Sequence, residues 1–168
     1  TAAIGALGSG LLNKCVLKFD AVSWPRNIEI FNRLADARGE WAEFVNLAAY
    51  GQGPAIMAFN AGSFARELEG ASDRATGRLA TEALRSMFGS SFPEPAGVQV
   101  TRWARDEQAF GSYSFPTDAT RADTRIRLLD AVDSRIFFAG EATSTNAPGT
   151  VHGAIRSGRA AAIAVVER

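Results

Sequence analysis

The sequence predicts an α/β fold, and three observations predict it. Segments rich in β-forming residues dominate the first part of the chain, and a strongly amphipathic helix follows them. Near the C-terminus lie a short apolar segment, a glycine-bounded polar loop and an Ala-rich helix. The 168 residues are enough for one domain, or for two intimate lobes, with a hydrophobic core.

Three strands are predicted before the first long helix. Cys15–Trp24 is β-rich with partial alternation, and Pro25 ends it. Residues 39–50 and 53–62 favour two further strands, joined by a turn around Gly51. These segments supply the sheet of the predicted fold.

The clearest helix signal lies between Ser72 and Gly89. Ser72 is a typical N-cap, apolar residues then recur at helical spacing, and Gly89 ends the run. The sequence therefore predicts an amphipathic helix that packs one face on the core.

The chain becomes less regular after this helix. Residues 98–103 alternate as a strand, and residues 111–133 are polar and irregular, with Leu128 and Leu129 as expected anchors. Arg135–Gly140 is apolar and is predicted as a short buried strand.

The last predicted helix begins near Thr150. Glycine costs about 0.5–1 kcal/mol inside a helix, so Gly153 and Gly158 indicate close packing. The first amides of a helix favour an anion, because they lack intrahelical partners and carry the positive end of the dipole. Glu141 would repel a phosphate and is better suited to accept a hydrogen bond from a sugar hydroxyl or a backbone amide. From these residues alone, an anion site and an ordinary helix start are equally open.

Charge and cysteine content narrow the function classes. The chain has 18 Lys and Arg against 18 Asp and Glu, so no overall field favours nucleic acid or an anionic membrane. No apolar run approaches the roughly 20 residues of a membrane span. Cys15 is the only cysteine and His152 the only histidine, which argues against a disulfide, a metal site or a serine triad. We expect a soluble protein of a reducing compartment such as the cytoplasm.

Three segments make the sequence similar to a known family. They are "GLLNKCVLKFD" at residues 10–20, "RWARDEQAFGSYSF" at residues 102–115 and "FFAGEATSTNAPGTVHGAIRSGRAAA" at residues 137–162. In this order they resemble the flavin-containing amine oxidases, a group that includes polyamine oxidases, monoamine oxidases and lysine-specific histone demethylases. The resemblance covers nearly the whole chain and aligns it with the C-terminal portion of such an enzyme.

The resemblance implies a division into lobes. An α+β substrate-binding lobe with a mixed sheet would span residues 11–122. Residues 1–10 and 123–168 would belong to a Rossmann-like FAD-binding lobe and include its C-terminal strand and helix.

The resemblance also implies roles for residues in the first two segments. Lys14 matches a lysine that binds a water near flavin N5, although by itself it is typical of a strand-end lysine with a solvated amine. Trp103 would pack near the isoalloxazine, and Tyr113 would form part of an aromatic cage for the amine. Gln108 stands where many relatives carry an aromatic residue, so either the cage is more polar or Phe110 substitutes.

The third segment matches cofactor contacts of the family. Glu141 would contact the ribityl or diphosphate region of FAD, and the backbone at Thr150 and Val151 would approach the pyrimidine edge of the flavin. The implied cofactor-binding residues are Lys14, Trp103, Gly140, Glu141, Gly149, Thr150 and Val151. The implied substrate-binding residues are Trp103, Gln108, Tyr113 and Thr150.

A diphosphate-binding glycine turn is missing from the sequence. "GALGSG" at residues 5–10 has the wrong spacing for G-x-G-x-x-G, and "GQGPAI" at residues 51–56 lacks the third glycine. We therefore expect the C-terminal half of an FAD-dependent amine oxidase that acts with a complementary N-terminal chain, or that self-associates. By family analogy, the reaction is hydride transfer from an amine to flavin N5, imine hydrolysis and peroxide formation. Two alternatives are a non-catalytic interaction module and a flavin-dependent amino-acid oxidase or desaturase.

Overall fold

The computed structural model describes residues 2–167 and divides the chain into two compact units. The sheet unit runs from Leu11 to Phe110, and the terminal unit joins the N-terminal residues up to Gly10 to the residues from Gly111 onward. The predicted α/β class is confirmed, because each unit contains both strands and helices. Each unit is described by itself.

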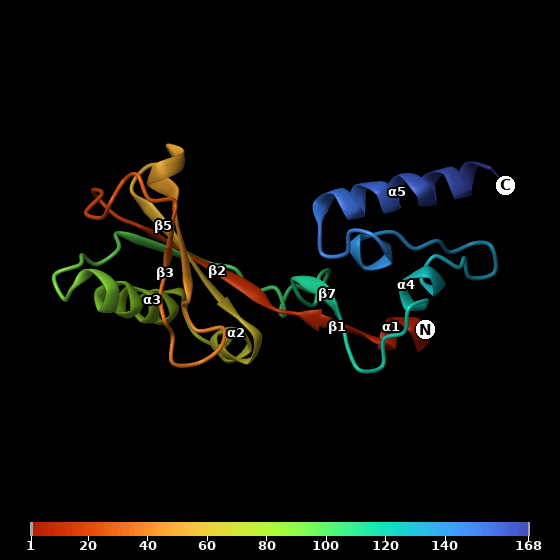
Figure 1. Cartoon of the computed structure of the whole chain (residues 1–168), viewed down its shortest axis with the longest axis horizontal. Helices are drawn as coiled ribbons and strands as arrows, with labels where there is room; N and C mark the ends of the chain where they lie inside the picture. The colour runs from red at the N-terminus through yellow and green to blue at the C-terminus, as the bar shows by residue number, and fades with distance from the viewer. Residues whose placement is uncertain (1, 168) are drawn as a thin grey trace. The chain divides into compact units, whose positions relative to one another are not determined.

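An antiparallel five-stranded sheet forms the frame of the sheet unit (Figure 1). Its strand order is β3-β4-β5-β2-β6. The strands are β2 (Leu12–Lys18), β3 (Ile30–Asn32), β4 (Glu43–Asn46), β5 (Ala55–Ala61) and β6 (Gly97–Val100). All pairings among these strands are antiparallel, whereas the sequence predicts a mixed sheet.

Alternation along β2 separates a core face of the sheet from an outer face. Asn13, Cys15 and Leu17 are buried, while the residues between them are half-buried. The core face packs against α3 (Asp73–Phe88), whose Ala80 and Leu84 are fully buried. The shorter helix α2 (Gly62–Leu68) follows β5 and adds Ala65 to the buried interior.

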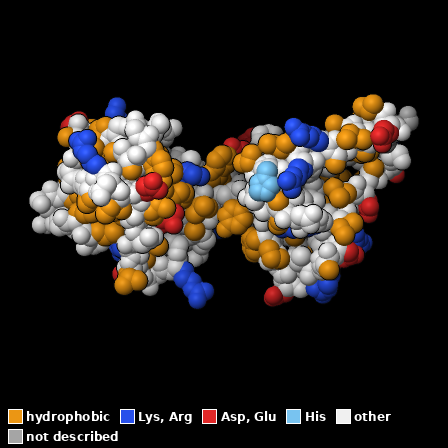
Figure 2. Space-filling model, turned by 45° about the horizontal axis from the view of Figure 1, so that its top comes forward, with side chains coloured by type: hydrophobic (Ala, Val, Ile, Leu, Met, Phe, Trp, Pro, Cys, Tyr) orange, Lys and Arg blue, Asp and Glu red, His pale blue; other side chains and the backbone are white. Residues whose placement is uncertain are grey.

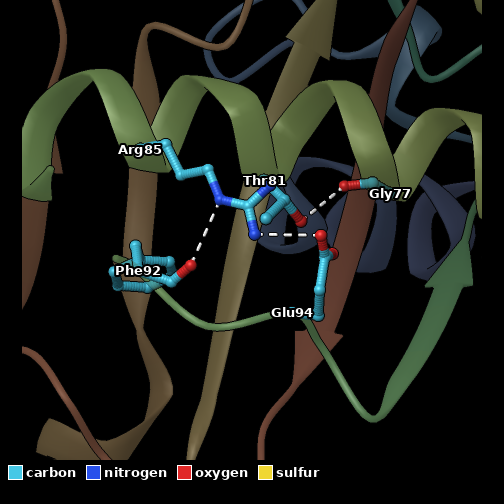
Figure 3. A network of polar contacts seen from close by, with 5 residues as sticks. All are labelled: Gly77, Thr81, Arg85, Phe92 and Glu94. Carbon is cyan, nitrogen blue, oxygen red and sulfur yellow. Dashed lines mark hydrogen bonds and ion pairs between the residues drawn. The ribbon is translucent and has the colours of Figure 1, made fainter. Parts of the chain in front are cut away.

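The predicted helix between Ser72 and Gly89 is confirmed as α3. The Ser72 hydroxyl accepts a hydrogen bond from the Ala75 amide at 3.2 Å, and Gly89 takes the C-cap position with a φ of 97°. Near the end of α3, Arg85 donates to the Phe92 carbonyl and pairs with Glu94 at 2.9 Å (Figure 3). These contacts hold the loop that leads into β6.

The first strands differ from the prediction in their limits. The predicted strand Cys15–Trp24 begins earlier, at Leu12, and ends at Lys18. Strands β4 and β5 fall inside the predicted segments, but Leu47–Tyr50 forms a 3-10 helix between them. Strand β3 was not predicted, because three residues are too few for a periodic signal.

The terminal unit contains a two-stranded ribbon and short helices. Strand β1 (Leu7–Gly10) pairs with β7 (Tyr113–Pro116). The helices are α1 (Ala2–Gly5), α4 (Thr124–Arg127), the 3-10 helix η2 (Glu141–Thr143) and α5 (Val151–Val166). Leu128 is the one buried hydrophobic residue of this unit among the described residues, and hydrophobic side chains lie at its surface (Figure 2).

The predicted buried strand Arg135–Gly140 is wrong. The stretch has no strand assignment, an isolated bridge joins Val132 to Ile136, and Ile136 is 55% exposed. A buried strand needs sheet neighbours on both sides, and the two described strands of this unit pair with each other. Of the two expected leucine anchors, Leu128 is buried and Leu129 is 46% exposed.

The resemblance assigns residues 111–122 to the substrate-binding lobe, and this assignment stays a prediction. By their contacts in this structure, these residues belong to the terminal unit. The reason is the pairing of Leu7 with Pro116 and of Gly10 with Tyr113, which ties this segment to β1. In residues 2–167, no helix is long and apolar enough to cross a membrane.

Candidate functional site

Lys14 lies on the outer face of the sheet, in the middle of β2. Its side chain is half-buried, and its cross-strand partner in β5 is Phe59. The Lys14 Nζ lies 5.7 Å from the centroid of the Phe59 ring. A cation over an aromatic face is stabilised by about 0.5–1 kcal/mol at an exposed site. The pairing therefore directs the ammonium group along the outer face.

The Lys14 backbone is joined to β6 by Thr101. The Lys14 amide donates to the Thr101 hydroxyl at 2.8 Å, and the Thr101 amide donates to the Lys14 carbonyl at 2.9 Å. The Thr101 hydroxyl in turn donates to Asn13 Oδ1 at 3.2 Å. The main-chain amide and carbonyl of Lys14 are thereby both bound by Thr101.

Trp103 is held through its main chain by the same asparagine. Its amide donates to Asn13 Oδ1 at 3.1 Å, and its side chain is half-buried. Asn13 itself is 2% exposed and donates through Nδ2 to Glu69 Oε1 at 2.8 Å. Glu69 Oε1 also accepts from the Ala104 amide at 2.9 Å. Lys14 and Trp103, two predicted site residues, thus share one polar network.

Gln108 lies apart from this network, in an exposed turn. Its amide, like that of Ala109, donates to Asp106 Oδ1. Phe110 has a φ of 53° and is 69% exposed, so its ring faces away from the core. Whether a cage is more polar or uses Phe110 stays a prediction.

Cys15 is next to Lys14 in β2 but faces the core. It is fully buried, and burial raises the pKa of its thiol to about 12, with nearby Asp73 adding to the rise and Arg102 opposing it. A thiol with this pKa is an inert core residue rather than a nucleophile.

In the terminal unit, Glu141 joins three segments. Its Oε1 accepts from the Ser114 amide at 2.7 Å, while Oε2 accepts from the Ser114 hydroxyl at 3.0 Å and the Gly149 amide at 2.6 Å. The backbone-amide role considered for Glu141 in the sequence is therefore present. A carboxylate oxygen accepts about two hydrogen bonds, so Oε1 keeps one position for a further donor.

Arg125 and Ser157 complete this polar framework. Arg125 donates to the Ser114 hydroxyl at 2.9 Å and to the Ala142 carbonyl at 2.7 Å. Ser157, in α5, accepts from the Gly140 amide at 2.9 Å and shares a short hydrogen bond with Thr143. The start of η2 is thereby fastened both to β7 and to α5.

The N-terminus of α5 is shaped by the Thr150 side chain. Its hydroxyl accepts from the Gly153 amide at 3.0 Å and donates to the Ala147 carbonyl at 2.8 Å, so the predicted helix start is confirmed. A Cβ on Gly153 would lie 2.0 Å from the Ala147 carbonyl oxygen, which confirms the expected close packing there. Apart from its chain neighbours and the backbone of α5 itself, no described atom lies within 4 Å of a Cβ built at Gly158, so close packing at that glycine is not observed.

The first two residues of α5 form an open end. Val151 is 78% exposed, and His152 lies at the surface as the pale blue side chain of Figure 2. Within residues 2–167, no hydrogen bond is formed by the amides of Val151 and His152. An anionic or electron-rich group can therefore meet the positive end of a 16-residue helix here.

Tyr113 stands on the ribbon of the terminal unit. Its cross-strand partner is Gly10, and a Cβ on Gly10 would lie 2.8 Å from the Tyr113 ring. The tyrosine ring therefore covers a position where only a glycine fits, and the side chain is 41% exposed. This packing fixes the ring while leaving part of it accessible.

The predicted site residues fall into two sets. Lys14, Trp103 and Gln108 belong to the sheet unit, and Lys14 and Trp103 are brought together by Asn13. Tyr113, Gly140, Glu141, Gly149, Thr150 and Val151 belong to the terminal unit, where Glu141 binds Gly149 directly.

Several polar residues of these networks were missed in the sequence. They are Asn13, Glu69, Ser114, Arg125 and Ser157. Asn13 had a signal, because an asparagine shares the inward face of the strand with the apolar residues Cys15 and Leu17. The other four act across long stretches of chain and left no local pattern.

The residues present fit the flavin implied by the resemblance. The open end of α5 offers two amides without hydrogen-bond partners among the described residues, and Glu141 Oε1 keeps one acceptor position. On the sheet unit, Lys14 offers a cation whose main-chain amide and carbonyl are both bound by Thr101. These groups suit an electron-rich ring system and a ligand with hydroxyl groups.

Comparison with known proteins shows the family to which this chain is similar. The profile of the family described as "Flavin containing amine oxidoreductase" matches residues 1–166. Lysine-specific histone demethylase 1 homolog 1 from Oryza sativa subsp. japonica is 38% identical over 162 residues, which cover 93% of this chain and 19% of the relative. Polyamine oxidase 2 from Arabidopsis thaliana is 37% identical over 160 residues, which cover 95% of this chain and 32% of the relative.

A solved structure shows the same fold. It is a double mutant of putrescine oxidase from a structure-based redesign of cofactor binding, and it matches with a TM-score of 0.79 at 18% identity. The match covers 99% of this chain and 37% of that chain. The chain spans about a fifth to a third of the length of the curated relatives it matches.

Proposed function

The chain belongs to the family of flavin-containing amine oxidoreductases, and we propose that it is the C-terminal part of an FAD-dependent, polyamine-oxidase-like enzyme. The complete enzyme oxidises an amine by hydride transfer from the carbon next to nitrogen, and the resulting imine is hydrolysed. Bound FAD would supply the hydride acceptor, and oxygen would be the final oxidant, with peroxide as its product. The remainder of the protein supplies the other contacts to FAD.

The observation that carries this proposal is the fixed position of Lys14. Its main chain is held by Thr101, and its Nζ lies over Phe59 on the outer face of the sheet. A lysine that only solubilised the strand would not need its Nζ over an aromatic ring. A positioned ammonium can hold a water molecule by hydrogen bonding and can favour negative charge on a neighbouring ring.

The terminal unit supplies the cofactor contacts in this proposal. The backbone at Thr150 and Val151, at the N-terminus of α5, would lie near the electron-rich edge of the bound ring system, and a helix N-terminus stabilises negative charge by about 0.3–2 kcal/mol. Glu141 holds Gly149 in place and would hold the ribityl or diphosphate region of FAD through its remaining acceptor position on Oε1. Gly140 and Gly149, with φ values of 139° and 70°, give the loop its path.

Each unit carries one aromatic side chain that the resemblance assigns to amine binding, Trp103 in the sheet unit and Tyr113 in the terminal unit. Trp103 and Tyr113 present half-buried or partly exposed rings, and aromatic faces attract a cationic amine. Thr150 and Gln108 add polar groups. The amine must be neutral when the hydride leaves, so rings that exclude water favour the reaction.

Exposed apolar side chains of the terminal unit indicate that a partner binds there. Its surface exposes Ile136, Phe138 and, on α5, Ile155 and Ile163, at fractions from 36% to 55%. Apolar surface of this kind is typical of an interface. A complementary N-terminal chain that covers it completes the FAD-binding lobe, and self-association is the alternative. The single buried cysteine fits a reducing compartment such as the cytoplasm.

Reconstitution tests the proposed function. The chain is combined with the complementary N-terminal part and FAD, and the flavin absorbance is followed without oxygen as amines are added. We expect bleaching with a polyamine or a primary amine, followed by peroxide when oxygen returns. A complex that binds FAD but is reduced by no amine contradicts an oxidase, and reduction by amino acids alone favours the amino-acid oxidase alternative.

A substitution tests the role of Lys14. Lys14→Met in the complete protein is expected to slow flavin reduction or reoxidation by about 100-fold or more, the range of a positioned proton-transfer group. Lys18→Met is the matched control, because Lys18 lies on the same strand and is exposed. Equal rates for the two variants remove Lys14 from the mechanism.

A further inference from the structure

Two buried polar residues lie directly behind the proposed active-site lysine. We propose that Asn13 and Glu69 form a positioning pair that sets the main chain at Lys14 and at Trp103 for amine oxidation. The inference rests on the proposed function and names two residues that act through others. Asn13, Glu69, Lys14 and Trp103 all belong to the sheet unit.

Asn13 is the centre of the pair. Its Oδ1 accepts from the Thr101 hydroxyl at 3.2 Å and from the Trp103 amide at 3.1 Å, while its Nδ2 donates to Glu69 Oε1 at 2.8 Å. The side chain of Asn13 thus links three segments that are far apart in sequence. Because it precedes Lys14 on a strand, its inward anchor holds Lys14 outward.

Glu69 fastens the segment that follows β6. Its Oε1 accepts from Asn13 Nδ2 and from the Ala104 amide at 2.9 Å. Consecutive amides, those of Trp103 and Ala104, are therefore bound by the two members of the pair. The chain carrying the Trp103 ring cannot shift without breaking a hydrogen bond in the buried interior.

The pair is costly if its only purpose is stability. Glu69 is 4% exposed, its Oε2 has no hydrogen-bond partner among the described residues, and the neighbouring Asn60 has none for its amide group. Asn60 is the cross-strand partner of Asn13. Burying such groups opposes folding, and well-packed apolar residues of similar volume are often equally or more stable. A positioning role explains why polar groups occupy this part of the core.

A set of variants in the complete, FAD-loaded protein tests the pair. Asn13→Ala and Glu69→Ala remove it, and Glu69→Gln keeps the accepting oxygen. Thr101→Val removes only the hydroxyl that links Asn13 to Lys14 and keeps the shape of a β-branched side chain. Asn46→Ala is the matched control, because Asn46 is a buried asparagine of the same sheet that binds Trp24, Pro25 and Ile28 instead.

The first measurement is the rate of anaerobic flavin reduction per bound flavin. We expect a loss of about tenfold in Asn13→Ala, Glu69→Ala and Thr101→Val, with little change in the amine concentration that gives half the maximal rate. The double variant Asn13→Ala/Glu69→Ala is no slower than the slower single variant, because the two residues act as a unit. Glu69→Gln and Asn46→Ala stay within about threefold of the parent.

The second measurement does not depend on activity. Amide hydrogen exchange at Trp103 and Ala104 is expected to speed up about tenfold in Asn13→Ala and Glu69→Ala, but not in Asn46→Ala. If the alanine variants do not fold, Thr101→Val and Glu69→Gln still provide the comparison.

The pair is overturned by unchanged exchange and reduction in Asn13→Ala and Glu69→Ala, or by a loss in Asn46→Ala equal to theirs. Equal losses in Glu69→Gln and Glu69→Ala also contradict it, because the accepting oxygen is then not what matters. A parent protein that no amine reduces defeats the proposed function instead, while the exchange measurement still decides whether the pair holds the chain.

Discussion

The two units of this chain are stabilised in different ways. The sheet unit contains 13 buried residues in one hydrophobic cluster, including Phe44, Ile56 and Leu84 at 0% exposure. In the terminal unit, Leu128 is the one buried hydrophobic residue among those described, and Glu141, Arg125 and Ser157 hold the segments by hydrogen bonds. A hydrophobic cluster stabilises a fold by itself, whereas exposed apolar surface needs a partner.

This difference matches a division of labour in the proposed enzyme. In the sheet unit, contacts with Thr101 and Phe59 hold Lys14 in place before any cofactor binds. The terminal unit has a prepared helix N-terminus at Thr150 but an apolar surface around it. We therefore expect the first unit to be rigid in this chain and the second to become rigid with its partner.

Thiol labelling gives the largest expected contrast between the units. The pKa of Cys15 is raised from 9.0 to about 12, so at neutral pH its thiolate fraction is lower by about a thousandfold, and the side chain is fully buried. A cysteine placed at Val132, which is 43% exposed in the terminal unit, is the comparison in Cys15→Ala/Val132→Cys. We expect labelling at position 132 to be faster by at least about 100-fold. Similar rates contradict a closed core around Cys15.

The same pKa shift predicts how stability depends on pH. The neutral thiol is favoured in the folded state, so its contribution is complete below pH 9, the ordinary pKa of the unfolded thiol. As the pH rises from about 9 to about 12, the unfolded state gains by losing the proton and the free energy of unfolding falls. Urea unfolding of the parent and of Cys15→Ala across this pH range isolates the contribution of the Cys15 thiol. If the free energy of unfolding falls equally with pH in both proteins, Cys15 makes no such contribution.

Matched leucine substitutions compare the cores. Leu84→Ala in α3 is expected to lower the free energy of unfolding by about 3 kcal/mol, because it leaves a cavity in a packed interior. Leu128→Ala in the terminal unit is expected to cost about 1 kcal/mol, since few neighbours are buried there. Denaturant unfolding followed by probes in each unit measures both. Equal costs show that the terminal unit has a core of its own.

A carboxylate-to-amide change tests the polar framework of the terminal unit. Glu141→Gln leaves one accepting oxygen in place of two, so it loses contacts to Ser114 or Gly149. We expect FAD binding to the complete protein to weaken about tenfold, the loss of one charge-assisted hydrogen bond. Asp130→Asn, an exposed carboxylate of the same unit, is the control. Equal affinities for the two variants exclude Glu141 from the cofactor loop.

Alanine substitutions at two glycines of α5 are expected to change stability the least, and in opposite directions. Gly158→Ala in this chain is expected to stabilise α5 by about 0.5–1 kcal/mol, because no described atom lies near its Cβ position. Gly153→Ala is expected to destabilise the helix start, where the new Cβ would meet the Ala147 carbonyl. Helicity and thermal unfolding of the two variants report the sign. A destabilising Gly158→Ala indicates that another surface packs on this face of α5.

Features set by neighbouring residues were predictable from the sequence. The α3 helix was placed correctly because Ser72 and Gly89 mark its ends locally. The start of α5 followed from Thr150 in the same way. Strands that depend on distant partners were harder to predict. In β1, for example, Leu7 pairs with Pro116, which lies far along the chain.

The predicted buried strand at residues 135–140 failed for a related reason. Its apolar residues are typical of a strand, but a strand exists only with neighbours to pair with. The candidate site shows the same limit. The resemblance named Lys14 and Trp103, whereas Glu69 is 56 residues from Asn13 and could be found only from the folded chain.

Native-state hydrogen exchange, with and without the complementary N-terminal part and FAD, tests the central claim most directly. In this chain alone, we expect the amides of β2, β5 and α3 to exchange only through opening of the sheet unit. The amides of η2 and α5 should exchange faster by at least about 100-fold. Adding the complement and FAD should slow exchange in η2 and α5 and leave β2 unchanged. Equal protection of both units in the chain alone, unchanged by the complement, would contradict the account.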